Sequence, residues 1–183
     1  MNLIDLIRDR ISPAQLGEPG PDSAQLRRIL EAGSRAPDHG RMKPWRFITI
    51  QGEARNRLGE VLARALQKRD PASLPEALEH ERKKPLRAPL MIVVAANVSD
   101  NPKVPAVEQM VAAGAAAQNI ILACHALGFG AFWRTGAPAY DDEVKAALGL
   151  GPQDALIGFL YIGTIVVPGK SKSPEIDSVT RSW

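Results

Sequence analysis

Hydrophobic residues recur along this chain with two different periods, and together they predict helices separated by strands. The spacing that buries one face of a helix is found in segments 2–9, 22–33, 52–67, 107–127 and 141–148. Continuous or alternating apolar runs typical of strands are found in segments 47–50, 89–96, 130–134 and 155–165. Since helices separate these strands unevenly, we expect an α+β sandwich with helices on both faces of a mixed sheet.

Segment 107–127 is the longest predicted helix, and most of its circumference is apolar or small. Such a helix must be covered on all sides, and a chain of 183 residues offers few elements to do so. We therefore expect a second copy of the chain to cover part of it. Gln118, Asn119 and His125 interrupt the segment, and its high alanine content also argues against a membrane span.

Composition and charge narrow the class of protein. The chain is 45% hydrophobic and 23% charged, which predicts one globular domain over residues 1–183. A net charge of +3 is too small for the concentrated basic surface of a nucleic-acid binder. The densest basic run, Arg82-Lys83-Lys84, lies in the polar segment 71–85, which we interpret as a solvated helix and its end.

Cysteine usage and the N-terminal residues favour a cytoplasmic protein. Cys124 is the single cysteine, so the chain forms neither an internal disulfide nor a multi-cysteine metal site. The three histidines also lack the spacing of zinc ligands, and no metal site is expected. Segment 1–8 includes an acidic residue and has no small-residue cleavage site, so we do not interpret it as a signal peptide.

Segment 34–47 carries the densest group of candidate binding residues. It leads from a helix into a strand through two prolines and a glycine, and its potentially cationic side chains are Arg35, His39, Arg41, Lys43 and Arg46. Such a concentration of donors is typical of a loop that binds an anionic group. Arg10 and Ser12 near the start of the chain, and segment 133–136, carry similar donors.

No motif indicates a catalytic group that works alone. The chain has no Gly-x-Ser-x-Gly nucleophile motif and no phosphate-binding loop ending in Gly-Lys-Ser or Gly-Lys-Thr. Cys124 and His125 are helix neighbours whose side chains diverge, so we interpret Cys124 as a buried apolar residue. The remaining donors cannot move electrons by themselves, so an enzyme built from them needs a cofactor.

Several motifs, taken in order, resemble the flavin-dependent nitroreductase family, especially its compact bacterial, YdjA-like members. The resemblance spans residues 3–165 and depends on order and spacing, because no single motif is diagnostic. The motifs are Arg10-Ile-Ser12, Arg35-Ala-Pro-Asp-His39, Lys43-Pro-Trp-Arg-Phe47, Lys103-Val-Pro105 with Glu108-Gln109, Leu127-Gly-Phe-Gly130, Trp133-Arg-Thr-Gly136 and Gly158-Phe-Leu-Tyr-Ile-Gly163-Thr164.

The resemblance implies a three-layer sandwich whose mixed, mainly antiparallel central sheet is flanked by helices, in an intertwined homodimer that binds FMN. Residues 10–12 would hold the phosphate and ribityl chain, and residues 35 and 39 would reach the flavin from the other subunit. Residues 133–135 would line the isoalloxazine edge, with Arg134 as the candidate catalytic residue. The implied flavin-binding residues are Arg10, Ile11, Ser12, Arg35, His39, Trp133, Arg134 and Thr135.

The implied activity is that of an FMN-dependent NAD(P)H nitroreductase, which passes hydride through flavin N5 to nitroaromatic or quinone-type acceptors by a ping-pong mechanism. Two alternatives stay open: a flavin carrier or sensor without turnover, and a dedicated flavin reductase or dehalogenase of an unknown metabolite. The chain departs from the family pattern at Ile11 and Gln15, where basic residues are common. Lys170, Lys172 and Arg181 are candidates to supply the missing phosphate contacts.

Overall fold

The computed structural model describes residues 2–13, 15–169 and 175–183. Its first two helices each begin after a side chain that caps them. Helix α1 (Leu3–Asp9) begins after Asn2, whose side chain accepts a hydrogen bond from the Asp5 amide. Helix α2 (Ser23–Gly33) begins after Asp22, which forms a capping box with Gln25.

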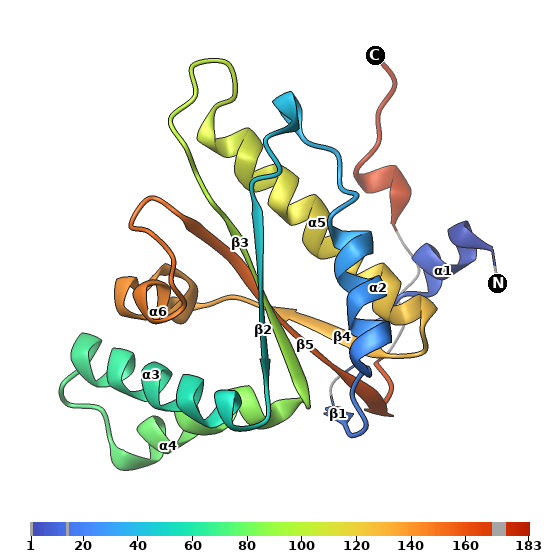
Figure 1. The fold of residues 1–183 in the computed structure, drawn as a ribbon. Coiled ribbons are helices and arrows are strands. Elements are labelled where there is room, and N and C mark those ends of the chain that lie inside the picture. Colours follow the sequence, from blue (N-terminus) through green and yellow to red (C-terminus); the bar gives the residue numbers. More distant parts are fainter. Residues whose placement is uncertain (1, 14, 170–174) are drawn as a thin grey trace.

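A five-stranded sheet forms the middle of the molecule (Figure 1). Its strands are β1 (Gln15–Gly17), β2 (Trp45–Gln51), β3 (Leu90–Ala96), β4 (Gly130–Arg134) and β5 (Ala155–Val167). The order is β1-β5-β3-β2, with β4 also paired to β5. The four pairings among the described strands are antiparallel, so the mainly antiparallel character is confirmed and no parallel pair is found within this part of the chain.

Helices cover both faces of the sheet, which gives the expected three layers (Figure 1). One face carries α3 (Glu53–Arg69), α4 (Pro75–Lys83) and α6 (Asp142–Ala147), and the other carries α2 and α5 (Ala106–Ala126). Short 3₁₀ turns link several elements: η1 (His39–Arg41), η2 (Lys84–Arg87), η3 (Ala137–Tyr140) and η4 (Ile176–Ser178). The segment predicted as one helical excursion, 71–85, thus contains α4 and the start of η2.

The core is divided by the sheet into two clusters. Every residue of β3 is buried, as expected for a central strand with both faces covered. Along β5, Leu160 and Ile162 pack toward α5, whereas Phe159 and Tyr161 pack toward α3. This alternation decides which side chains of β5 can line a site on the α3 side.

Helix α5 packs on the sheet and against α2, but one of its faces is not covered by the residues that the structure describes. Val107 and Val111 on that face are 59% and 66% exposed. By length and composition alone the helix could span a membrane, with a mean hydropathy of 1.2. A helix that packs on the sheet of a layered globular fold can meet the same two criteria, and α5 packs on the sheet beside α2 here (Figure 1).

Candidate functional site

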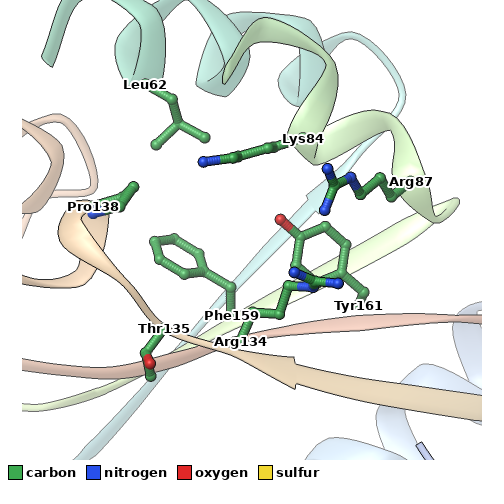
Figure 2. A pocket seen from close by; sticks show the side chains of 8 residues that line it. All are labelled: Leu62, Lys84, Arg87, Arg134, Thr135, Pro138, Phe159 and Tyr161. Atoms are coloured by element: carbon green, nitrogen blue, oxygen red, sulfur yellow. The ribbon is translucent and has the colours of Figure 1, made fainter. Parts of the chain in front are cut away.

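A small cavity of about 70 Å³ lies on the α3 side of the sheet, where β4 ends beside β5 and η2 (Figure 2). Its lining is both apolar and cationic, and Figure 2 shows these side chains surrounding one space. The lining residues are Leu62, Lys84, Arg87, Arg134, Thr135, Pro138, Phe159 and Tyr161. Two of the residues predicted to bind a flavin, Arg134 and Thr135, therefore belong to this cavity.

Strand geometry explains why Arg134 and Tyr161 reach the same cavity. Side chains alternate between the faces of a sheet, and β4 is paired with β5 so that Arg134 lies opposite Phe159 and Phe132 opposite Tyr161. The Arg134 guanidinium lies 4.5 Å from the centre of the Phe132 ring, and this cation–π contact holds it along the strand. The four residues therefore form one patch of the α3 face.

Three cations from two elements face the cavity, and one nearby carboxylate offsets them only in part. Lys84 forms an ion pair with Glu81, whose other carboxylate oxygen is buried without a hydrogen-bond partner among the described residues. The Arg87 Nη2 atom lies 3.2 Å from the His80 Nε2 atom. Arg134 makes the cation–π contact with Phe132 described above. The excess of positive charge makes this cavity suited to an anionic ligand.

The Tyr161 hydroxyl adds a neutral donor to this set. Burial raises the pKa of Tyr161, and the neighbouring Arg87 and Arg134 offset that increase only in part. The phenol therefore stays protonated at neutral pH, and it can donate a hydrogen bond to a ligand in the cavity.

Arg10, Ile11 and Ser12 lie at the other end of β4. Pro13 packs over Gly130, where a Cβ atom would stand 2.6 Å from the proline Cγ. The Arg10 guanidinium donates to the Ser12 hydroxyl at 3.3 Å, and Ser12 is exposed. A Cβ atom at Gly169 would lie 2.8 Å from the Ser12 carbonyl oxygen, so the chain after β5 passes directly beside this segment.

Strand β4 therefore separates two groups of donors on one face of the sheet. The side of Gly130 that meets Pro13 is the side toward which Arg134 projects, because the two positions are an even number of residues apart. Four steps along a strand span about 13 Å. Arg10 and Ser12 lie near one end of this span, and the cationic cavity lies at the other.

Arg35 and His39 are not brought to this face within one chain. Both are exposed, and the His39 Nδ1 atom lies 2.5 Å from the Glu108 Oε2 atom at the start of α5. Helix α5 extends about 30 Å, and α1, which leads to Arg10, lies beside its far end (Figure 1). A ligand at Arg10 therefore meets His39 only if that histidine comes from a second copy.

The Trp133 side chain lies on the opposite face from the cavity. Its indole nitrogen donates to the Ile157 carbonyl at 3.2 Å, and the ring packs on the α5 side of the core beside Gly158. Its main chain in β4 is the part that adjoins Arg134. Cys124 is fully buried on α5, and burial raises its pKa to about 12, which confirms its interpretation as an apolar core residue.

The sequence interpretation missed the other three polar residues of the cavity, Lys84, Arg87 and Tyr161, and its apolar lining. Lys84 was assigned to a solvated helix end, but that assignment is wrong, because its side chain is only 27% exposed and lines the cavity. The sequence did carry one signal for these two cations: Lys84 and Arg87 stand just before the buried strand β3, so they lie near the edge of the core. Lys170 and Lys172 lie outside the described residues, and Arg181 is exposed.

Comparisons with known sequences agree with this arrangement of motifs. A sequence model described as the nitroreductase family matches residues 8–164. The protein named putative NAD(P)H nitroreductase YdjA in Escherichia coli K12 is 43% identical over 164 residues, which cover 90% of this chain and 88% of that protein. A Haemophilus influenzae protein named putative NAD(P)H nitroreductase is 35% identical, with 97% and 96% of the two chains covered.

Solved structures share the fold. A nitroreductase-like family protein from Bacillus cereus superposes with a TM-score of 0.83 at 23% identity, covering all of this chain and 96% of the other. A Desulfovibrio desulfuricans protein, described as a putative nitroreductase in complex with FMN, gives a TM-score of 0.76 at 24% identity. The superposition covers 100% of this chain and 98% of that protein.

Proposed function

The chain belongs to the nitroreductase family, and from that premise we propose that it is an FMN-dependent NAD(P)H oxidoreductase. The observation that carries the proposal is the cavity at the end of β4, where Lys84, Arg87, Arg134 and a protonated Tyr161 converge. A reduced flavin carries negative charge on its ring, and such a donor set stabilises that charge where water is partly excluded.

The residues at both ends of β4 fit the two parts of FMN. Arg10 offers a planar fork of donors that matches phosphate oxygens, and the exposed Ser12 hydroxyl lies beside it. Arg134, Thr135 and the main chain of 133–135 would face the isoalloxazine edge, with Lys84 and Arg87 across the cavity. When bound, FMN supplies two-electron chemistry at N5, accepting hydride from NAD(P)H and passing it to a nitroaromatic or quinone-type acceptor.

The protein side of this chemistry is binding, orientation and charge. The Tyr161 hydroxyl and the three cations project into the cavity from β5, β4 and η2, and there they would stabilise negative charge on a bound flavin. Since one cavity would serve donor and acceptor in turn, we expect ping-pong kinetics. Two copies of the chain would form each site, because His39 contacts Glu108 at the end of α5 that lies far from Arg10.

Replacing Arg10 with alanine tests the phosphate assignment. The variant should bind FMN more weakly by about 1–3 kcal/mol, because the phosphate loses a charged hydrogen-bond partner. The measurement is the FMN dissociation constant, from quenching of flavin fluorescence. Arg27→Ala is the matched control, since Arg27 is an exposed arginine whose ion pair among the described residues is with Glu31 on α2. An unchanged dissociation constant in Arg10→Ala would refute this assignment.

Stopped-flow mixing with NADH or NADPH tests turnover itself. Bound flavin should lose its visible absorbance on mixing and regain it when a nitroaromatic or quinone is added. A yellow protein whose flavin never bleaches would favour the carrier or sensor, and a colourless protein that does not bind added FMN would exclude the proposed cofactor.

A further inference from the structure

The loop that carries His39 has an unusual backbone. Gly40, Arg41 and Lys43 adopt positive φ angles of 70°, 56° and 49°. For residues with a Cβ atom this conformation costs roughly 1–3 kcal/mol, and it persists only where surrounding contacts enforce it. Here the Lys43 amide donates to the Asp38 carboxylate at 2.8 Å, and Arg46 donates to the Lys43 carbonyl at 3.2 Å.

The strained loop presents His39 to α5, where Glu108 contacts it. The Glu108 Oε2 atom lies 2.5 Å from His39 Nδ1, a contact between residues 69 positions apart in the chain. A carboxylate can only accept, so Nδ1 carries the proton, and the ring is held in one orientation. No described residue hydrogen bonds to Nε2, and the side chains of His39 and Glu108 are 58% and 46% exposed.

The surroundings of this pair have the composition of a ligand or subunit contact. His39 and Glu108 border a shallow groove whose other residues are mainly apolar, including Pro37, Val107 and Val111. An isolated exposed pair of this kind contributes only about 0–1 kcal/mol to folding. Stability alone therefore does not explain why a strained loop is held against it.

We infer that Glu108 is a positioning residue for the flavin site: it holds the His39 ring through Nδ1 so that Nε2 faces the FMN bound to a second copy of the chain. This inference rests on the proposed function, since it takes FMN as the ligand. Glu108 does not touch the flavin, and it acts only through the orientation and tautomer of His39.

A double-mutant cycle on FMN binding tests the inference. His39→Ala and Glu108→Ala should each weaken FMN binding roughly 2- to 12-fold, the loss expected for one hydrogen bond. The double variant should bind no more weakly than either single variant, because both changes remove the same contact. Glu108→Gln should retain most of the affinity, because its amide oxygen still accepts from Nδ1.

The controls separate positioning from folding and from the proposed function. Glu31→Ala, which breaks an exposed helix ion pair elsewhere, should leave FMN binding unchanged. Losses that multiply in the double variant, or a Glu108→Ala protein that binds FMN like the wild type, would overturn the inference. If only Arg10→Ala loses FMN, the inference fails while the proposed function stands. If the wild-type chain binds no FMN, both fail. Melting temperatures of all variants should match within a few degrees.

Discussion

Tyr161 shows how one side chain in the cavity depends on its charged neighbours. Burial is the largest cause of its raised pKa, because a buried phenolate loses its contacts with water. Arg87 and Arg134 lower the pKa by stabilising the phenolate, and Glu81 raises it. The pKa of this hydroxyl therefore reports whether Arg87 and Arg134 lie near it as described.

Replacing Arg87 with leucine should raise the pKa of Tyr161 further, because one of its two stabilising cations is lost. Phenolate absorbance followed across a pH titration measures it, and the chain has only one other tyrosine, Tyr140, which is 78% exposed. Arg87→Lys keeps the charge, and it should leave the pKa near the wild-type value. A pKa that falls in Arg87→Leu would contradict the described cavity.

Residue roles could be predicted from the sequence where they follow from local neighbours. Cys124 and His125 adjoin each other on a helix, and that alone identified Cys124 as a core residue. Lys84 has the same kind of neighbours as a solvated lysine, and its position just before β3 is a weak signal beside its contact with Glu81 and the packing of η2. Trp133 lies within a recognisable motif, yet the alternation of β4 turns its indole to the other face.

At the level of elements, the packing of α4 on α3 positions the cations of η2. Gly59 on α3 leaves no space for a side chain, because a Cβ atom there would overlap the Arg82 carbonyl. Since η2 begins directly after α4, this close approach sets where Lys84 and Arg87 lie. The contact between α3 and α4 lies outside the cavity, and it therefore determines where the cationic side chains of η2 stand around it.

Gly59→Ala should destabilise the fold by about 1–3 kcal/mol, because α4 must move away from α3. For a chain of this size that lowers the melting temperature by about 2–4 °C per kcal/mol. We also expect weaker FMN binding as the η2 cations shift. Asn56→Ala on the exposed side of α3 is the control. A Gly59→Ala protein as stable as this control would show that the helices separate freely.

Most elements were predictable from their hydrophobic period, and even the short strand β4 has the predicted bounds. The helices α2, α3 and α5 carry enough periodic positions that their ends lie within a few residues of the predicted ones. Strand β1 was missed because its three residues carry no period, and it forms only by pairing with β5 far along the chain. The turns η1 and η2 are likewise set by packing.

The whole molecule leaves many large apolar side chains exposed on the side that carries α1, α5 and the C-terminal segment (Figure 1). Among them are Leu3, Ile4, Val107, Val111, Ile176 and Val179. Val107 and Val111, exposed on a helix that is otherwise largely buried, make this side of α5 a candidate association surface. The sequence predicted this for α5, because its helix is apolar nearly all round.

Val111→Glu should convert the expected homodimer into monomers, because a charge would be buried on the uncovered face of α5. FMN retention should fall with it, since residues 35 and 39 of the second copy are lost. Light scattering gives the mass, and absorbance gives the flavin content. Leu74→Glu, at a 68% exposed position beside α4, is the control and should change neither. A Val111→Glu protein that stays dimeric would contradict the expected interface.

Strand β4 has a consequence for which flavins the protein retains. Its pairing with β5 fixes its length, and so fixes the distance between Arg10 and the proposed ring-binding end. Riboflavin, which lacks the phosphate, would bind only at the ring end and would make no phosphate contact with Arg10. A flavin dinucleotide would reach both ends. Its adenosine half would then have to pass the place where Gly169 lies close to Ser12 and project outward.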